Sequence, residues 1–196
     1  MKDESGEIGM EPDADEHRAL PALFAQSRGR RISSATLAGD RVWIKRYDAE
    51  RRPFPKRLHS LISPLLLLPF LRSAKETDAA GMADREMRKM AAFRAAGFEV
   101  PRIVGRDGSA IILSDVAPIM QDRLDGSRKS DPAAHDALLV QCAVALGKAH
   151  AAGLCHGRPH PRDFFEKDGV PGFLDFEEEP ETVMSLAAAQ ARLRDL

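Results

Sequence analysis

Cysteine is scarce in this sequence, which contains only Cys142 and Cys155. Two cysteines cannot form the disulfide framework of a small secreted domain, so the chain fits a reducing compartment and we expect it to be cytoplasmic. An excess of either charge is also missing, because 29 basic and 30 acidic residues leave a formal net charge of -1. The net charge therefore creates no positive electrostatic field that would favour binding of nucleic acid, and such binding would need a local basic patch.

A secretory signal and a membrane-spanning segment are missing too. The first residues, "MKDESGEIGMEPDADEH", are acidic and polar, which predicts a disordered leader over residues 1–20. The most apolar stretch, "LISPLLLLPFL" at 61–71, is too short to cross a bilayer and contains two prolines. Basic residues flank it, so two interpretations stay open: a buried loop or short helix, or a peripheral contact of residues 51–75 with the inner face of a membrane.

The sequence does contain signals for a series of short β-strands and α-helices. The turn signals "AGD" and "RDG" predict a hairpin over residues 30–47 and two short strands within 98–116. Helical spacing predicts helices over 78–96, over 131–152 and near the C-terminus. The chain of 196 residues therefore indicates an α+β fold in which a small mixed-sheet lobe and a helical lobe share a cleft.

The stretch "SDPAAHDALLVQCAVALGKAHAAG" carries the strongest helix signal in the chain. Ser130 or Asp131 can cap this helix, Pro132 suits its first turn, and Gly153 can end it. We expect a broad apolar face on it, made of Leu138, Leu139, Cys142, Val144, Leu146 and Ala149.

Strand residues 41–47, "RVWIKRY", alternate between two faces. Val42 and Ile44 share one face, and Trp43 and Lys45 share the other. A lysine on the face of Trp43 is either a surface lysine or one that points into a cleft. If Lys45 points into a cleft, Glu86 in the middle of the helix at 78–96 can hold it there.

The stretch "GLCHGRPHPRDFFEKDGVPGFLDFEEEP" concentrates polar side chains between glycines and prolines. Asp175 follows a short apolar strand, and Asp163 lies in the loop before that strand. Two carboxylates are hard oxygen ligands that suit Mg²⁺ with bound phosphates. Lys45 could meet the same phosphates.

These residues together resemble the protein-kinase-like fold, in particular the bacterial lipopolysaccharide kinases (Kdo and heptose kinases) and related sugar and aminoglycoside kinases. The resemblance covers most of the chain from about Arg31 to Pro180. It implies an N-lobe over 21–116, which carries Glu86, and an abbreviated helical C-lobe over 117–196. It also implies ATP and Mg²⁺ as cofactors and transfer of the γ-phosphate to a hydroxyl of a sugar or glycolipid.

The resemblance also implies individual roles. Lys45 corresponds to the strand lysine that contacts the α- and β-phosphates, and Glu86 to its helix partner. "IILSDVA" resembles the segment between the lobes, where backbone groups of Ser114, Asp115 and Val116 would meet adenine. "HGRPHPRDF" resembles the catalytic loop H-G-D-x-H-P-x-N, and "LDFEE" resembles the Asp-Phe-Gly element, with Asp175 as a metal ligand.

The catalytic loop departs from the family at two positions. Arg158 stands where the catalytic aspartate is expected, and an arginine cannot accept a proton. Asp163 replaces an asparagine, and its carboxylate can still bind Mg²⁺. General-base assistance is worth about 10²–10⁴ in rate, so Arg158 could stabilise the migrating phosphoryl group while His160 or Asp163 takes the proton. The glycine-rich phosphate loop is also missing, and Gly29 is the only glycine in that region.

Three other functions stay open at this point. A pseudokinase would keep Lys45, Glu86 and Asp175 for the fold and would pair Arg158 with the acidic run 177–179. A zinc protein would use ligands among His150, Cys155, His156 and His160, although their spacing matches no finger pattern. Nucleic-acid binding has the least support, because the basic connector near 51–69 has no interleaved aromatic residue beyond Phe54.

Overall fold

The computed structural model of the chain describes residues 14–49 and 77–191. The leader residues 1–13 and the connector 51–75, with its predicted membrane contact, lie outside the described residues. The described elements, in chain order, are α1 (Ala14–Gln26), β1 (Ile32–Leu37), β2 (Asp40–Arg46), α3 (Ala79–Ala95), β3 (Ile103–Asp107), β4 (Ala110–Ser114), α4 (Met120–Ser127), α5 (Pro132–Ala151), the 3₁₀ turn η3 (Pro161–Asp163), β5 (Phe164–Lys167), β6 (Val170–Phe173), η4 (Pro180–Thr182) and α6 (Leu186–Gln190).

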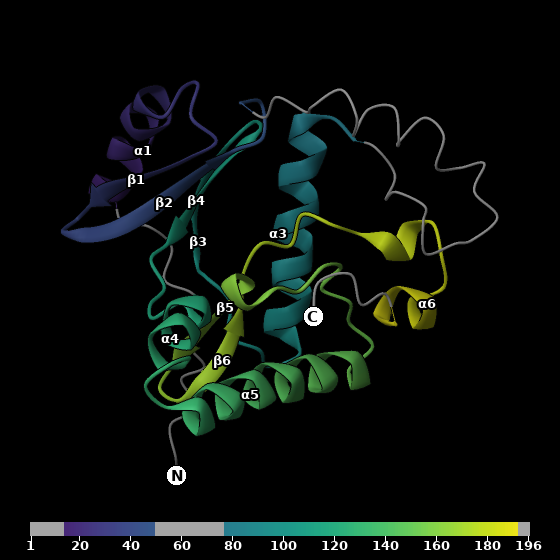
Figure 1. Cartoon of the computed structure of the whole chain (residues 1–196). Coiled ribbons are helices and arrows are strands. Elements are labelled where there is room, and N and C mark those ends of the chain that lie inside the picture. The colour runs from purple at the N-terminus through teal and green to yellow at the C-terminus, as the bar shows by residue number, and fades with distance from the viewer. Residues whose placement is uncertain (1–13, 50–76, 192–196) are drawn as a thin grey trace, which may run out of the picture.

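The fold is α+β with two lobes, as predicted. A sheet with α1 and α3 forms one lobe, and α4, α5 and the hairpin β5–β6 form the other (Figure 1). None of the helices within the described part of the chain is both long and apolar enough to span a membrane.

The sheet of the first lobe has the strand order β1-β2-β4-β3, and every neighbouring pair is antiparallel. The expectation of a mixed sheet is therefore wrong, because two hairpins lie side by side with no crossover between parallel strands. The first hairpin turns at Ala38 and Gly39, whose φ angles are 51° and 94°. Positive φ at both turn positions matches the right-handed twist of the paired strands.

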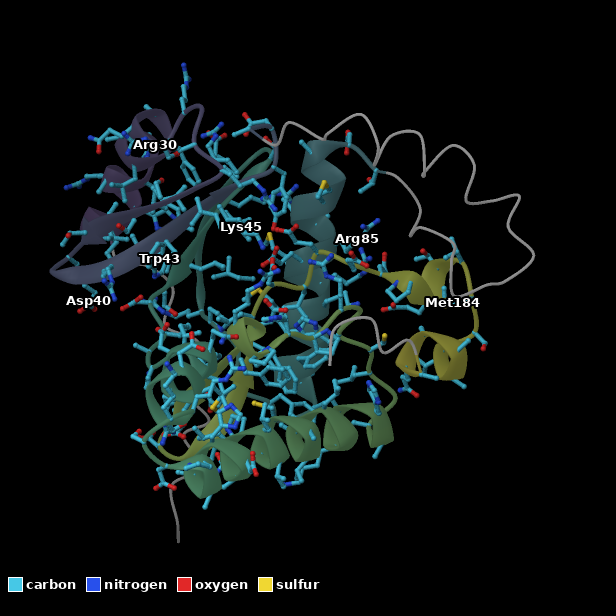
Figure 2. All side chains as sticks on the ribbon, viewed as in Figure 1. Arg30, Asp40, Trp43, Lys45, Arg85 and Met184 are labelled. Carbon is cyan, nitrogen blue, oxygen red and sulfur yellow. The ribbon has the colours of Figure 1, made fainter. Side chains whose placement is uncertain are left out.

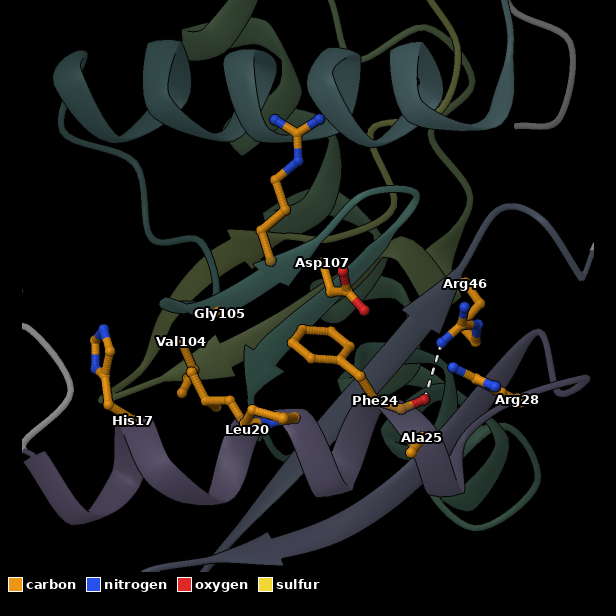
Figure 3. A pocket seen from close by; sticks show the side chains of 11 residues that line it. His17, Leu20, Phe24, Ala25, Arg28, Arg46, Val104, Gly105 and Asp107 are labelled. Carbon is orange, nitrogen blue, oxygen red and sulfur yellow. Dashed lines mark hydrogen bonds between the residues drawn. The ribbon is translucent and has the colours of Figure 1, made fainter.

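Helix α1 covers one face of this sheet. Leu23 and Phe24 are buried against Val42 and Ile44, and Arg46 donates from Nη1 to the carbonyl of Phe24 at 3.0 Å (Figure 3). The prediction of a disordered leader is therefore wrong for residues 14–20, since the apolar side chains that hold the helix follow the polar start of the chain. Between α1 and β3 lies a cavity of about 600 Å³, drawn in Figure 3.

Helix α3 covers the other face of the sheet and also contacts the second lobe. Asp78 caps it by accepting from the N–H of Gly81 at 2.8 Å, and Gly97 follows its end with a φ of 85°. Met82, Met90 and Phe93 are buried on this helix. They belong to one apolar cluster that includes side chains of β4, α5 and β6, so the two lobes share a core.

Helix α5 lies beneath α3 in Figure 1, and Asp131 caps it by accepting from the N–H of Ala134 at 3.0 Å. The apolar face predicted for it was too broad. Leu138, Cys142, Leu146 and Ala149 are buried, but Leu139 and Val144 are 40% and 50% exposed. Successive helical residues are rotated by about 100°, which turns these two side chains away from the buried stripe.

The predicted short strand near Gly172 is one half of a hairpin, since β6 pairs with β5. Phe164, Phe165 and Phe173 of this hairpin are buried. The N–H of Phe173 donates to the carbonyl of Glu99 at 2.9 Å, which ties the hairpin to the segment after α3. The predicted C-terminal helix is shorter than expected, as α6 ends at Gln190.

Candidate nucleotide site

A cavity of about 500 Å³ lies between the sheet, α3 and the chain that follows β6. Most of its lining is apolar. All of the predicted nucleotide-contacting residues line it together with the metal candidate Asp175, and they come from β2, α3, β4 and the segments after β4 and β6: Lys45, Glu86, Ser114, Asp115, Val116 and Asp175. A mostly apolar cavity of this volume with a few convergent polar groups is typical of a small-molecule site.

Lys45 lies on the Trp43 face of β2, between the sheet and α3 (Figure 2). Its Nζ is 2.7 Å from Glu86 Oε2, 2.5 Å from Asp175 Oδ1 and 2.7 Å from Glu177 Oε1. Hydrogen bonds to Glu86 and Asp175 use two of the three protons of the ammonium group, and Glu177 adds an ion pair. Burial acts to lower the pKa of Lys45, but these carboxylates outweigh it and hold the pKa above its usual value.

Glu86 is only 1% exposed, although a glutamate in the middle of a helix is usually solvated. Its Oε2 accepts from both Lys45 Nζ and the hydroxyl of Tyr47. Burial and the charge of Glu86 raise the pKa of Tyr47, so the phenol stays protonated and donates. Glu86 therefore orients Lys45 from a position that is itself fixed.

Glu177 belongs to the same cluster, and sequence reasoning did not single it out. Its Oε1 accepts from Lys45 and from Arg31. A signal was present, because Glu177 lies only two positions after Asp175, within the acidic run 177–179. Burial raises the pKa of Glu177, against the effect of Lys45.

Asp175 has a φ of 62°, a left-handed conformation that is strained for a residue with a Cβ. Its carboxylate is 44% exposed, and Lys45 lowers its pKa despite burial. Asp163 is buried and accepts from the N–H of His160 at 2.9 Å. Burial and the nearby charge of Asp175 raise the pKa of Asp163 to about 7.

The two aspartates fit a divalent cation. Their mutual repulsion, which the raised pKa of Asp163 reports, would be relieved by an ion bound between them. Carboxylate oxygens are also the ligands that Mg²⁺ prefers. That Asp163 and Asp175 together hold Mg²⁺ stays a prediction, because the described side chains close enough to share one ion are Glu86, Asp175 and Glu177.

The predicted catalytic residues Arg158, His160 and Asp163 do not line the cavity. Arg158 Nη1 lies 3.8 Å from Glu178 Oε1, within the acidic run that the pseudokinase interpretation named. His160 Nδ1 accepts from the N–H of Arg162 at 3.3 Å, so this nitrogen is already occupied. The structure therefore brings Lys45, Glu86 and Asp175 together and leaves Arg158, His160 and Asp163 outside the cavity lining.

His156 is buried and contacts the backbone and the side chain on either side of Asp175. Its Nε2 lies 2.6 Å from the carbonyl of Leu174, directly before Asp175, and its ring packs on Phe176 with a centroid separation of 4.8 Å. Burial lowers the pKa of His156 to about 4, so the ring is neutral near pH 7. Among the described residues, the side chains close enough to share one metal ion are Glu86, Asp175 and Glu177, and this group does not include the histidines and cysteines of the zinc interpretation.

The segment after β4 is anchored by its own side chains. Asp115 accepts from Trp43 Nε1 at 2.5 Å and from Arg41 Nη2 at 3.0 Å. The N–H groups of Ser114 and Asp115 donate to the carbonyls of Arg102 and Arg41. These two N–H groups are therefore not open to a base, although both residues line the cavity.

No protein-family model matches this chain, and no curated protein matches it. Among solved structures, the chain is similar to the complex of Rv3197 with erythromycin from Mycobacterium tuberculosis, at 21% identity and a TM-score of 0.45, over 75% of this chain and 42% of that one. It is also similar to the Rio2 kinase–ADP/Mg²⁺–phosphoaspartate complex from Chaetomium thermophilum, at 17% identity and a TM-score of 0.46, over 93% of this chain and 59% of that one. This chain thus spans less than two thirds of each structure's length. Because both TM-scores are below 0.5, the function of this protein is argued from its own contacts.

Proposed function

We propose that this protein binds ATP with Mg²⁺ and transfers the γ-phosphate to a hydroxyl group. The supporting observation is the cavity of about 500 Å³, which joins an apolar lining to a lysine held by a buried glutamate and to an aspartate in a strained conformation. A flat base suits the apolar part, and a polyphosphate suits the charged part.

Each charged residue has a distinct role in this proposal. Lys45 donates to phosphate oxygens, and Glu86 keeps its ammonium group in position. Asp163 and Asp175 hold Mg²⁺, which neutralises charge on the phosphates when bound. Phosphoryl transfer through a loose transition state depends mainly on such positioning and on charge neutralisation.

The proton of the acceptor hydroxyl has no dedicated base in this arrangement. Arg158 cannot accept a proton, Nδ1 of His160 already accepts a hydrogen bond, and Asp163 is assigned to Mg²⁺ in this proposal. The lost general base corresponds to about 10²–10⁴ in rate, so slow turnover is expected. The resemblance makes a sugar or glycolipid hydroxyl the proposed acceptor, and the basic apolar segment 51–75 is proposed to contact the membrane that carries it.

A pseudokinase is the second candidate function. The ion pair between Arg158 and Glu178 supports the pseudokinase, because Arg158 stands at the position expected for the catalytic aspartate. In this alternative the cavity binds a nucleotide without transfer, and the bound state is recognised by a partner.

Binding and transfer should be measured separately on the full chain. Calorimetric titration with ATP and Mg²⁺ should show binding, and Lys45→Met should weaken it at least tenfold. Lys167→Met is the matched control, since Lys167 pairs with Glu99 on the surface and does not line the cavity. Release of labelled phosphate to water or to a lipopolysaccharide sugar supports the kinase, and binding without release supports the pseudokinase. Absence of binding in the wild type would refute both candidates.

A further inference from the structure

Two cations converge on a single oxygen atom, and one of them is Lys45, which lines the cavity. Glu177 Oε1 accepts from Arg31 Nη2, directly before β1, and lies 2.7 Å from Lys45 Nζ, on β2. A phosphate oxygen attracts cationic donors in the same way. The carboxylate of Glu177 thus occupies the position that these two cations would offer to a phosphate group.

Arg31 is held toward this position by contacts that do not involve Glu177. Its guanidinium lies over the ring of Tyr47, 5.2 Å from the centroid, and its Nη1 donates to the carbonyl of Arg46 at 3.5 Å. Lys45 is likewise held by Glu86. Both cations therefore keep their orientation if the side chain of Glu177 leaves.

Glu177 is better able to leave than Glu86. Its backbone is fixed by α3, because Arg85 Nη1 donates to its carbonyl at 3.1 Å, whereas its side chain is 20% exposed at the edge of the cluster. Glu86, in contrast, is 1% exposed and also bound by Tyr47. The side chain of Glu177 can rotate toward solvent without a change in the backbone.

Charge balance favours its departure when an anion arrives. Arg31 and Lys45 face the carboxylates of Glu86, Asp175 and Glu177, so the cluster has one negative charge in excess. A polyphosphate entering this cluster would be repelled by that excess. Withdrawal of Glu177 makes the remaining four side chains neutral as a group.

We propose that Arg31 and Lys45 form an anion site for a phosphate group, and that Glu177 occupies this site in the free protein and is displaced when a polyphosphate binds. Arg31 then supplies the phosphate contact that a glycine-rich loop would otherwise make. The nucleotide identity of the ligand rests on the function proposed above, whereas the anion site itself does not.

The test uses inorganic tripolyphosphate, which carries the anionic groups without a base. Calorimetric titration should show about tenfold tighter binding by Glu177→Gln than by the wild type, since one competing negative charge is removed. Glu178→Gln is the matched control and should stay within twofold, because the side chain of Glu178 pairs with Arg158 instead of with the two cations. Adding Arg31→Gln to Glu177→Gln should abolish the gain.

The proposal is overturned if Glu177→Gln binds tripolyphosphate no more tightly than the wild type, including the case in which neither binds. Glu177→Asp, which keeps the charge but shortens the side chain, should show a smaller gain and serves if the glutamine variant fails to fold. A gain for tripolyphosphate without any binding of ATP would refute the proposed nucleotide function and leave the anion site standing.

Discussion

At the scale of single residues, burial decides which titratable groups carry charge. His156 resembles the histidine of a kinase catalytic loop, yet it is 1% exposed, and its Nε2 is bound to the carbonyl of Leu174. Its Nδ1 has no hydrogen-bond partner among the described residues, so a second proton on the ring would be buried without compensation. His156 therefore positions the backbone before Asp175 and does not act as a base.

The protonation of His156 should make the protein less stable in mild acid. Its pKa is about 4 in the folded state and about 6.5 when unfolded, so between these values the unfolded state binds more protons and stability falls as the pH falls. The His156→Gln variant has no imidazole, so it lacks this dependence of stability on pH. The difference in unfolding free energy between wild type and variant should shrink by about 2 kcal/mol from pH 7.5 to pH 5, measured by urea denaturation. The titration of Asp163 does not affect this difference, because both proteins contain Asp163. A difference that stays constant over this range would contradict the lowered pKa of His156.

At the scale of elements, α3 holds the acidic segment that follows Asp175. Lys89 donates from Nζ to the carbonyls of Glu178 and His156, at 2.7 Å and 3.2 Å, and to Glu181 Oε1 at 3.0 Å. The fit is close, since a Cβ added at Gly157 would lie 2.6 Å from the carbonyl oxygen of Glu178. The helix that carries Glu86 thus also fixes the backbone that carries Asp175 and Glu177.

Removal of this cation should loosen the contact between α3 and the acidic segment. Lys89→Met leaves two buried carbonyls and the carboxylate of Glu181 without their donor, which should cost about 2–4 kcal/mol of unfolding free energy. Lys129→Met, at an exposed position, is the control and should change stability by less than about 0.5 kcal/mol. Urea denaturation measures both variants. A loss below about 1 kcal/mol for Lys89→Met would show that the contact is not important for stability.

At the scale of the whole molecule, the two lobes share one apolar core. Phe93 of α3 contacts Phe173 and Phe176 of the second lobe, with ring centroids 5.1 Å and 4.7 Å apart. The same cluster includes Ile111 of the sheet and Leu138 of α5. A shared core of this kind predicts that the lobes unfold together.

Cooperative unfolding can be followed with two probes. Trp43 is the only tryptophan and lies in the sheet, whereas far-UV circular dichroism reports mainly on helices such as α5. The two transitions should coincide in urea, and Phe93→Leu should shift both equally, by about 1–2 kcal/mol. Two separate midpoints, or a shift of one probe alone, would show that the lobes are independent units.

The elements that sequence reasoning found are those with strong local signals. The turn at Ala38 and Gly39, the cap at Asp131 and the apolar run 110–113 each act within a few residues, so they can be recognised without the fold. Helix α1, by contrast, starts in a polar stretch and is stabilised by contact with a distant sheet. Strand β5 was missed for a similar reason, since its pairing with β6 and its burial depend on the rest of the lobe.

For the candidate site, the sequence by itself determined the chemical types: a lysine on an alternating strand, a glutamate on a helix, two aspartates near a short strand, and an arginine where a base was expected. The spacing of these residues along the chain is a local property, so it can be read directly. Only the tertiary structure decided that Glu86 is buried, that Glu177 joins Lys45 and Arg31, and that Arg158 lies beside Glu178. Burial and ion pairing depend on which distant segments pack together, and these contacts set the charge and the accessibility of each group.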